Sequence, residues 1–209
     1  MTDFNDLVSG YRRFRTTGYE RQRSRWEELA GGQSPKVMVI ACSDSRVDPA
    51  QIFDVSPGEI FVVRNVANLV PPFETGGGRH GVSAALEFAV TQLEVPEIVV
   101  VGHGSCGGVA ASLSHRFRGA SPGAGGFIDH WVDMLDEARD RIIAEHGQGE
   151  DAAHAMELET VRVSLTNLRT FPFVQERESA GKLALHGAYF SISHGILHVM
   201  DDAGAFSPA

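Results

Sequence analysis

The sequence predicts an α/β fold with a central, mainly parallel sheet flanked by helices. Three short apolar runs, 37–41, 60–63 and 98–101, each stop at turn-forming or polar residues. Such runs are typical of strands buried on both faces of a parallel sheet. The segment between the second and third runs, 81–93, has apolar residues at helical spacing. Strand, helix and strand in this order predict a βαβ unit.

The N-terminal segment predicts a helical arm. Residues 4–30 carry apolar side chains at spacings of three and four, first at Leu7, Val8, Tyr11 and Phe14 and again at Trp26. Six arginines lie among them: Arg12, Arg13, Arg15, Arg21, Arg23 and Arg25. The arm could bind nucleic acid, or it could pack on an acidic partner subunit. We favour the partner subunit, because the rest of the chain is strongly acidic and offers no basic, aromatic surface.

The remaining elements follow from periodicity and from Gly and Pro content. We expect a helical turn at 49–53, loops at 70–78 and 117–126, and helices at 127–145 and 152–170, the second stopped by Pro172. Strands at 182–186 and 195–200 and a short tail complete the chain. The predicted organisation is an arm at 1–32 followed by one α/β domain at 33–209.

Composition excludes several classes of protein. The 209 residues carry a formal net charge of −9, which argues against a nucleic-acid partner. No apolar run approaches the roughly 18 residues that span a bilayer, so we expect no membrane association. The first residues lack the features of a signal peptide, and two cysteines do not make a disulfide framework. We therefore expect a cytoplasmic protein.

Two of the predicted strands end in chemically reactive residues. Cys42, Asp44 and Arg46 directly follow the first apolar run, and His103 and Cys106 follow the third. In open α/β sheets, ligands bind beyond the carboxyl ends of the strands. If the two strands are neighbours, their side chains converge on one point.

The converging residue types suit tetrahedral zinc, which prefers sulfur and nitrogen ligands with occasional oxygen. The alternative is that each cysteine is a small buried hydrophobe. A second histidine pair, His194 and His198, has no Glu or Cys beside it, and we interpret those two as solvated side chains.

These residues resemble the β-class carbonic anhydrases. The family signatures C-x-D-x-R and G-H-x-x-C-G-G are matched by 42–46 and 102–108, and further similar segments extend the resemblance from Gln33 to Val199. The resemblance implies a Zn²⁺ ion held by Cys42, His103 and Cys106, and reversible hydration of carbon dioxide to bicarbonate and a proton.

The expected mechanism uses a zinc-bound hydroxide that an Asp44–Arg46 dyad orients. Arg46 would hold Asp44 ionised, and Asp44 would accept a hydrogen bond from the hydroxide. Asp44 could instead ligate the zinc and close the site. We expect pairing with Arg46 at alkaline pH and metal ligation at lower pH.

The resemblance also implies the substrate contacts. Gln33 is expected to donate to bicarbonate from an adjacent subunit, Phe61 and Val66 to shape an apolar pocket, and Gly107 to offer a backbone N–H. A Gln33 supplied by a partner implies a homodimer or a homotetramer.

Some positions depart from the family pattern. Phe88 stands where many members have Tyr, and Gly104 where Ser or a larger residue is common. One subgroup binds a regulatory bicarbonate with Trp, Arg and Tyr. Here these positions hold Val39, Arg64 and Phe190, so we expect no such site and place the chain nearer the subgroup that includes plant enzymes.

Two other functions remain open at this point. The same fold and zinc ion could act on a sulfur analogue such as carbonyl sulfide or carbon disulfide. The chain could also be a non-catalytic, zinc-dependent interaction module, although a structural zinc site would need neither Asp44, Arg46 nor Gln33.

Overall fold

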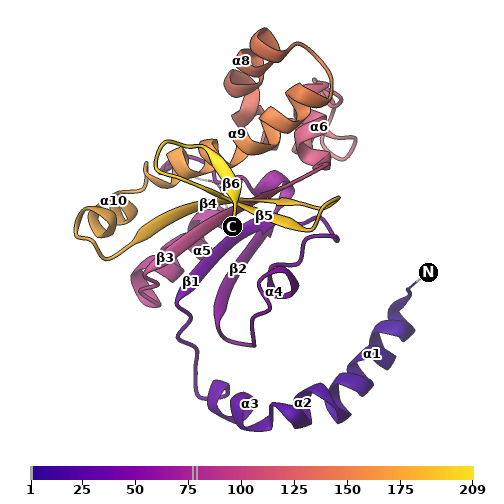
Figure 1. The fold of residues 1–209 in the computed structure, drawn as a ribbon, viewed down its shortest axis with the longest axis vertical. Coiled ribbons are helices and arrows are strands. Elements are labelled where there is room, and N and C mark those ends of the chain that lie inside the picture. Colours follow the sequence, from indigo (N-terminus) through magenta and orange to yellow (C-terminus); the bar gives the residue numbers. More distant parts are fainter. Residues whose placement is uncertain (1, 77, 79) are drawn as a thin grey trace.

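The computed structural model describes residues 2–76, 78 and 80–209. Its centre is a six-stranded sheet in the order β2-β1-β3-β4-β5-β6, which confirms the predicted α/β class (Figure 1). The first four strands in this order run parallel, and β5 and β6 join antiparallel at one edge. The strands are β1 (Val37–Cys42), β2 (Ile60–Asn65), β3 (Glu97–His103), β4 (Ala184–Ser191), β5 (Ile196–Met200) and β6 (Phe206–Pro208).

Strand register brings the ends of β1 and β3 to the same edge of the sheet. Ala41 on β1 pairs with Val101 on β3, so Cys42 and His103 emerge one and two residues later at neighbouring positions. On the other side of β1, Cys42 pairs with Asn65 of β2. The predicted adjacency of the two strands is therefore confirmed.

Alternation along the strands builds two cores. Met38 and Ile40 face the helices, where they pack with Leu86 and with Val161 and Leu165 of the longest helix. Val39 and Ala41, the alternate residues on β1, face the other side of the sheet. They pack with Val101 of β3 and Ala188 of β4 in a smaller cluster.

Helices cover the first of these faces. They are α5 (Gly81–Glu87), which continues as a π-helical segment at Phe88–Gln92, α9 (Glu150–Leu168) and α10 (Pro172–Ser179). The helices α6 (Gly107–Leu113), α7 (Gly126–Val132) and α8 (Asp136–His146) instead pack around a cluster that contains Cys42 and Cys106. Shorter elements are α4 (Pro49–Ile52) and 3₁₀ turns at Val66–Asn68 and Asp133–Leu135.

The structure corrects four predicted elements. The expected helix at 127–145 is divided into α7, a 3₁₀ turn and α8. Pro172 does not only end a helix. It also begins α10, because proline suits the first turn, where no intrahelical N–H is needed. The strand expected at 182–186 is shifted to β4, and the expected tail contains β6.

The predicted arm is helical but not continuous. It consists of α1 (Phe4–Thr16), α2 (Gly18–Arg21) and α3 (Arg23–Leu29), with breaks at Thr17 and Gln22. In Figure 1 the arm extends away from the sheet, and none of its helical residues is buried. Its apolar side chains are strongly exposed at Phe4 (76%), Leu7 (62%) and Tyr11 (60%).

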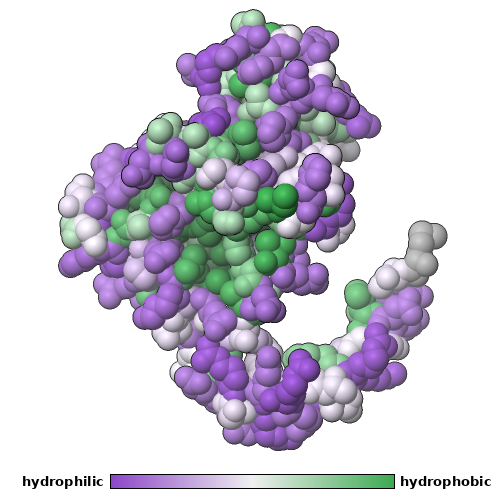
Figure 2. Space-filling model, in the orientation of Figure 1, coloured by the Kyte–Doolittle hydropathy of each residue, from purple (hydrophilic) through white to green (hydrophobic). Residues whose placement is uncertain are grey.

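The second face of the sheet has little cover. Val62 aligns with Val39, and Val199 aligns with Ala188, so both belong to this face, and they are 39% and 41% exposed. Figure 2 shows apolar side chains gathered over the strands in the middle of the view. Within the described residues, no helix has the length and apolar character that crossing a membrane requires.

Candidate metal centre

The carboxyl ends of β1 and β3 bring three potential metal ligands together. The ligand atoms of Cys42, His103 and Cys106 all lie within 4.8 Å of one another. The three residues are almost fully buried, with exposures of 6%, 1% and 2%. In the described part of the chain this is the sole cluster of three or more His, Cys, Asp or Glu side chains with metal-binding spacing.

The donor geometry fits a zinc ion. The two sulfur atoms lie 3.9 Å apart. Two thiolates bound to one tetrahedral zinc at about 2.3 Å would be separated by about 3.8 Å. His103 Nδ1 is 2.9 Å from the carbonyl oxygen of Gly104 and therefore donates to it. Among the residues that the structure describes, the buried Nε2 atom has no hydrogen-bond partner, so its lone pair can ligate a metal, as in the usual pattern of metal-binding histidines.

The Cys42 thiol is polarised toward a thiolate. The hydrogen bond with Cys106 lowers the pKa of Cys42, against the opposing effect of burial. The same hydrogen bond and burial raise the pKa of Cys106. Burial opposes the charged form of His103, whereas its contact with the Cys42 thiolate raises its pKa. A cation at the centre of the cluster would favour the thiolate form of both cysteines.

Asp44 and Arg46 form the predicted pair beside this cluster. Arg46 Nε and Nη2 donate to the two carboxylate oxygens of Asp44 at 2.9 and 2.7 Å, and the Arg46 backbone N–H donates at 3.0 Å. These bonds hold the pKa of Asp44 well below its ordinary value. Arg46 Nη2 also donates to the carbonyl of Ser105 at 3.0 Å, which connects the loops after β1 and β3. A second pair, Asp48–Arg64 at 3.1 Å, lies next to it.

Sequence reasoning missed a buried acid behind Cys106. Glu157 on α9 is 7% exposed. Its carboxylate accepts from Tyr189 Oη at 2.9 Å and from the backbone N–H of Cys106 at 3.4 Å. Burial, followed by the neighbouring Glu157, raises the pKa of Tyr189. The sequence signal was the helical spacing of the polar residues Glu157, Thr160 and Ser164 on α9. The structure shows that all three are buried.

The predicted substrate contacts are not all near the cluster within one chain. Val66 follows β2, and a Cβ on Gly108 would lie 2.7 Å from it, so Val66 adjoins the start of α6. Gly107 opens α6, and a Cβ there would meet nothing within 4 Å. Phe61 pairs with Met38, four residues before Cys42, which corresponds to about 13 Å along the strand. Gln33 is exposed and lines a hollow next to the arm with Arg25 and Leu29.

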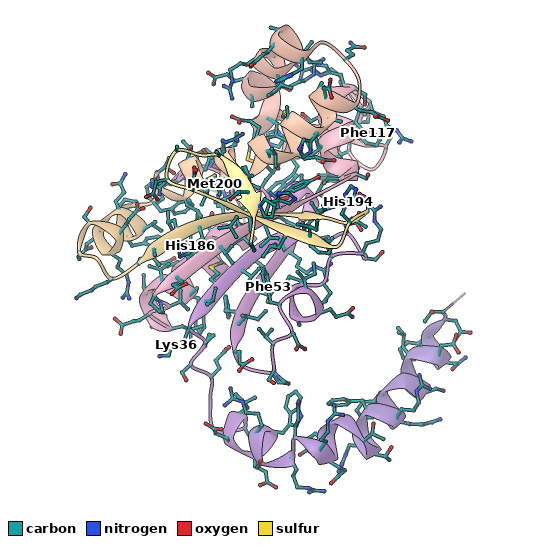
Figure 3. All side chains as sticks on the ribbon, viewed as in Figure 1. Lys36, Phe53, Phe117, His186, His194 and Met200 are labelled. Carbon is teal, nitrogen blue, oxygen red and sulfur yellow. The ribbon has the colours of Figure 1, made fainter. Side chains whose placement is uncertain are left out.

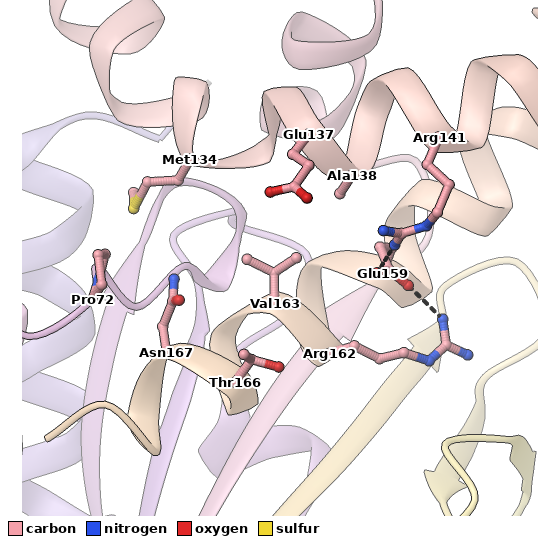
Figure 4. Close-up of a pocket in the computed structure, with 10 residues that line it drawn as sticks. All are labelled: Pro72, Met134, Glu137, Ala138, Arg141, Glu159, Arg162, Val163, Thr166 and Asn167. Carbon is pink, nitrogen blue, oxygen red and sulfur yellow. Dashed lines mark hydrogen bonds and ion pairs between the residues drawn. The ribbon is translucent and has the colours of Figure 1, made fainter.

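Other candidate features lie elsewhere. His194 is exposed in the turn between β4 and β5, where its Nδ1 atom contacts the hydroxyls of Ser191 and Ser193 at 2.9 and 3.0 Å (Figure 3). A hollow of about 360 Å³ lies between α8 and α9 (Figure 4). Its two arginines, Arg141 and Arg162, are both paired with Glu159. It contains none of the cluster residues.

The fold and the donor set define a zinc-dependent α/β enzyme, with a Cys₂His site at the carboxyl edge of a mainly parallel sheet. A family model described as "Carbonic anhydrase" matches residues 37–197. The chain belongs to the carbonic anhydrase family, in its β class.

Individual relatives agree with this assignment. The chain is 40% identical to "Beta carbonic anhydrase 3" of Arabidopsis thaliana, over 90% of this chain and 73% of that protein. It is 36% identical to "Beta carbonic anhydrase 6, mitochondrial" of the same plant, over 91% of this chain and 66% of that protein.

Solved structures show the same architecture. The β-carbonic anhydrase CcaA is 32% identical and superposes with a TM-score of 0.90, covering 98% of this chain and 91% of that one. A Coccomyxa β-carbonic anhydrase in complex with acetazolamide is 31% identical with a TM-score of 0.81, covering 100% and 94%. Tetrameric β-carbonic anhydrases of Sordaria macrospora include a chain 27% identical, with a TM-score of 0.80 and coverage of 98% of both chains.

Proposed function

We propose that the chain performs the reaction of its family, the reversible hydration of carbon dioxide to bicarbonate and a proton, with Cys42, His103 and Cys106 as the zinc ligands. The observation that carries the proposal is the buried Cys₂His cluster with the Asp44–Arg46 pair beside it. Zinc, when bound, acidifies a water molecule and so supplies a nucleophile near neutral pH. Three protein ligands leave one tetrahedral position for that water.

Asp44 orients the attacking group. Its side chain is 19% exposed, and Arg46 holds it ionised through two side-chain hydrogen bonds. An ionised carboxylate only accepts hydrogen bonds, so it selects one orientation of a donor beside the cluster. Asp44 as a fourth zinc ligand in a closed state remains part of the proposal. In the present arrangement its carboxylate faces Arg46.

The substrate contacts come from two chains. Val66 directly follows β2, the neighbour of β1, and Gly107 directly follows the ligand Cys106. Val66 offers an apolar side chain that is 39% exposed, and Gly107 is an exposed residue at the start of α6. Phe61 and Gln33 are displaced from the cluster of their own chain, and we assign both to the site of a partner subunit. An apolar wall suits carbon dioxide, which carries no net dipole.

Self-association as a homodimer or homotetramer would complete the site and cover the apolar surfaces. The arm presents Leu7 and Tyr11, and the second face of the sheet presents Val62 and Val199. Exposed apolar surface of this extent marks an interface. We assign residues 1–32 to the arm and 33–209 to the zinc-binding domain. If the arm of one copy packs on another copy, the apolar side chains of the arm and of the second sheet face become buried.

Two free thiols that face each other suit a reducing compartment, and we propose the cytoplasm. Fractionation of cells with an antibody to the native protein tests this assignment. Recovery in an organelle or an oxidising compartment would contradict it.

Stopped-flow measurement of carbon dioxide hydration with a pH indicator tests the reaction. The zinc-loaded protein should hydrate carbon dioxide rapidly, and Cys106→Ser should not. His194→Asn is the control, because His194 is exposed and lies outside the cluster. Slow hydration together with fast sulfide release from carbonyl sulfide or carbon disulfide would reverse the assignment. A zinc-loaded protein inactive in both assays would make it a binding module.

A further inference from the structure

Arg64 on β2 reaches across to the loop that follows β1. Its partner in the sheet is Ala41, and the β1–β2 ladder ends just beyond, where Ser43 N–H donates to the Asn65 carbonyl at 2.8 Å. Past this point the backbone of residues 43–48 leaves the sheet. Its carbonyl groups therefore need hydrogen-bond donors from elsewhere.

Each of the three guanidinium nitrogens of Arg64 donates one hydrogen bond to this region. Nε donates to the carbonyl of Cys42 at 2.9 Å, and Nη2 donates to the carbonyl of Asp44 at 2.6 Å. Nη1 donates to Asp48 Oδ2 at 3.1 Å. The planar guanidinium fixes the relative positions of its partners in a way that a single ammonium group does not.

Asp48 is itself held in place. Its Oδ1 atom caps α4 by accepting from the backbone N–H groups of Ala50 and Gln51 at 3.0 and 3.3 Å, which leaves Oδ2 for Arg64. The Arg64 side chain is 27% exposed. The Arg64–Asp48 pair therefore connects the strand β2 and the first turn of α4 to the backbone of a zinc ligand and of Asp44.

Asp44 is consequently restrained at both ends. Its carboxylate is held by Arg46, whereas its carbonyl accepts from Arg64 and from the Val47 N–H at 3.2 Å. Rotation of the Asp44 carbonyl would break the hydrogen bond from Arg64 Nη2. We propose that Arg64, held by Asp48, is a positioning residue that sets the orientation of the Asp44 carboxylate at the metal centre. This inference rests on the proposed function, in which Asp44 orients the attacking group.

The first test is a kinetic double-mutant cycle. Arg64→Lys should lower kcat by at least about 10-fold while KM changes by less than about 2-fold, because the lost interaction acts on the transition state. Zinc content should stay that of the wild type, since all three ligands remain. In an Asp44→Asn background, assayed at raised enzyme concentration, the same Arg64→Lys change should alter kcat by less than about 2-fold.

Arg162→Lys is the matched control. Arg162 has the same pattern of contacts, with Nε and Nη2 donating to the Gly204 carbonyl at 3.1 and 2.8 Å and Nη1 donating to Glu159, but it lies beside the hollow in Figure 4. It should leave kcat unchanged. If Arg64→Lys fails to fold, Asp48→Asn replaces it, because this change keeps the shape of the side chain and removes only the charge that holds Arg64.

The second test does not depend on activity. Amide hydrogen exchange should become at least about 10-fold faster at Arg46 and Val47, whose N–H groups donate to Asp44, in Arg64→Lys but not in Arg162→Lys. The proposal is overturned if exchange at these two amides is unchanged or if Arg64→Lys loses zinc. It is also overturned if Arg64→Lys lowers kcat by the same factor in the wild-type and Asp44→Asn backgrounds. An inactive wild type with the expected exchange pattern would instead contradict the proposed function alone.

Discussion

The sulfur atoms of Cys42 and Cys106 lie 3.9 Å apart, although 64 residues separate them in the chain. The contact exists because β1 and β3 are neighbours with a register that ends both at one edge. Together with the hydrogen bond from Arg46 to the Ser105 carbonyl, it joins the segments that follow the two strands. Substitution of Cys42 or Cys106 should therefore affect both zinc binding and the packing at this edge of the sheet.

Replacement of one ligand should remove the metal and the activity together. Cys106→Ser leaves two protein ligands and a weakly donating hydroxyl, so zinc content, measured by atomic absorption, should fall to near zero along with hydration. His194→Asn is the control, because it removes an exposed imidazole outside the cluster and should retain full zinc content. Full activity in a metal-free Cys106→Ser protein would contradict the proposed site.

Removal of zinc with a chelator should destabilise the protein as well as inactivate it. A ligand that binds the native state at about 100 times its Kd contributes roughly 3 kcal/mol to the free energy of unfolding. We expect a loss of at least about that size in urea denaturation. Addition of zinc should restore both stability and hydration, whereas magnesium, which prefers oxygen ligands, should restore neither.

Asp44→Asn separates catalysis from metal binding. The variant keeps the shape of the side chain but loses the charge that pairs with Arg46 and the acceptor-only character of the carboxylate. We expect wild-type zinc content and a kcat lowered by about 100-fold, a typical size for a positioned acid or base group. Asp136→Asn, which removes the charge that pairs with Arg118, should have no such effect. An unchanged kcat would show that Asp44 has no part in orienting the attacking group.

Gly102 is required by close packing beneath the metal centre. A Cβ at this position would lie 2.8 Å from Val161 Cγ2 and 3.2 Å from the backbone oxygen of Glu157. Overpacking of this kind costs about 1–3 kcal/mol, which we expect for Gly102→Ala in urea denaturation. Gly81→Ala is the control, since a Cβ there meets nothing within 4 Å and should leave stability unchanged or slightly raised.

The exposed side chains of the arm should govern assembly. The double variant Leu7→Asp and Tyr11→Asp places charges on the apolar stripe of α1, where both residues are more than half exposed in the single chain. Sedimentation equilibrium should show a smaller species than the wild type. Phe127→Asp, at a side chain that is 73% exposed on α7, is the matched control. An unchanged mass in the arm variant would exclude the arm from the interface.

The parts of this molecule that the sequence predicted best were those governed by local pattern. Short apolar runs defined β1, β2 and β3, and the reactive residues at and just after the ends of β1 and β3 defined the ligand cluster. The apolar spacing of the arm resumes only after Gly18, but it does not locate the breaks at Thr17 and Gln22. Proline at 172 is compatible both with the end of one helix and with the start of another, and the structure has both.

Contacts between distant segments were the limit of sequence reasoning. Glu157 approaches Cys106 only because α9 crosses the carboxyl end of β3, and neither pattern nor spacing reveals that crossing. Arg64 could be noticed in the sequence, but its three acceptors depend on the register between β1 and β2. The displacement of Phe61 from the cluster also follows from register, which apolar periodicity does not specify.

The partly exposed apolar face of the sheet has a consequence for how the protein behaves on dilution. A chain that buries this surface only against another copy gains part of its folding free energy from association, and mass action then governs it. Its melting temperature should rise with chain concentration, and highly dilute samples should lose activity over time. Specific activities measured at nanomolar and micromolar enzyme would then differ for reasons unrelated to the chemistry at the zinc ion.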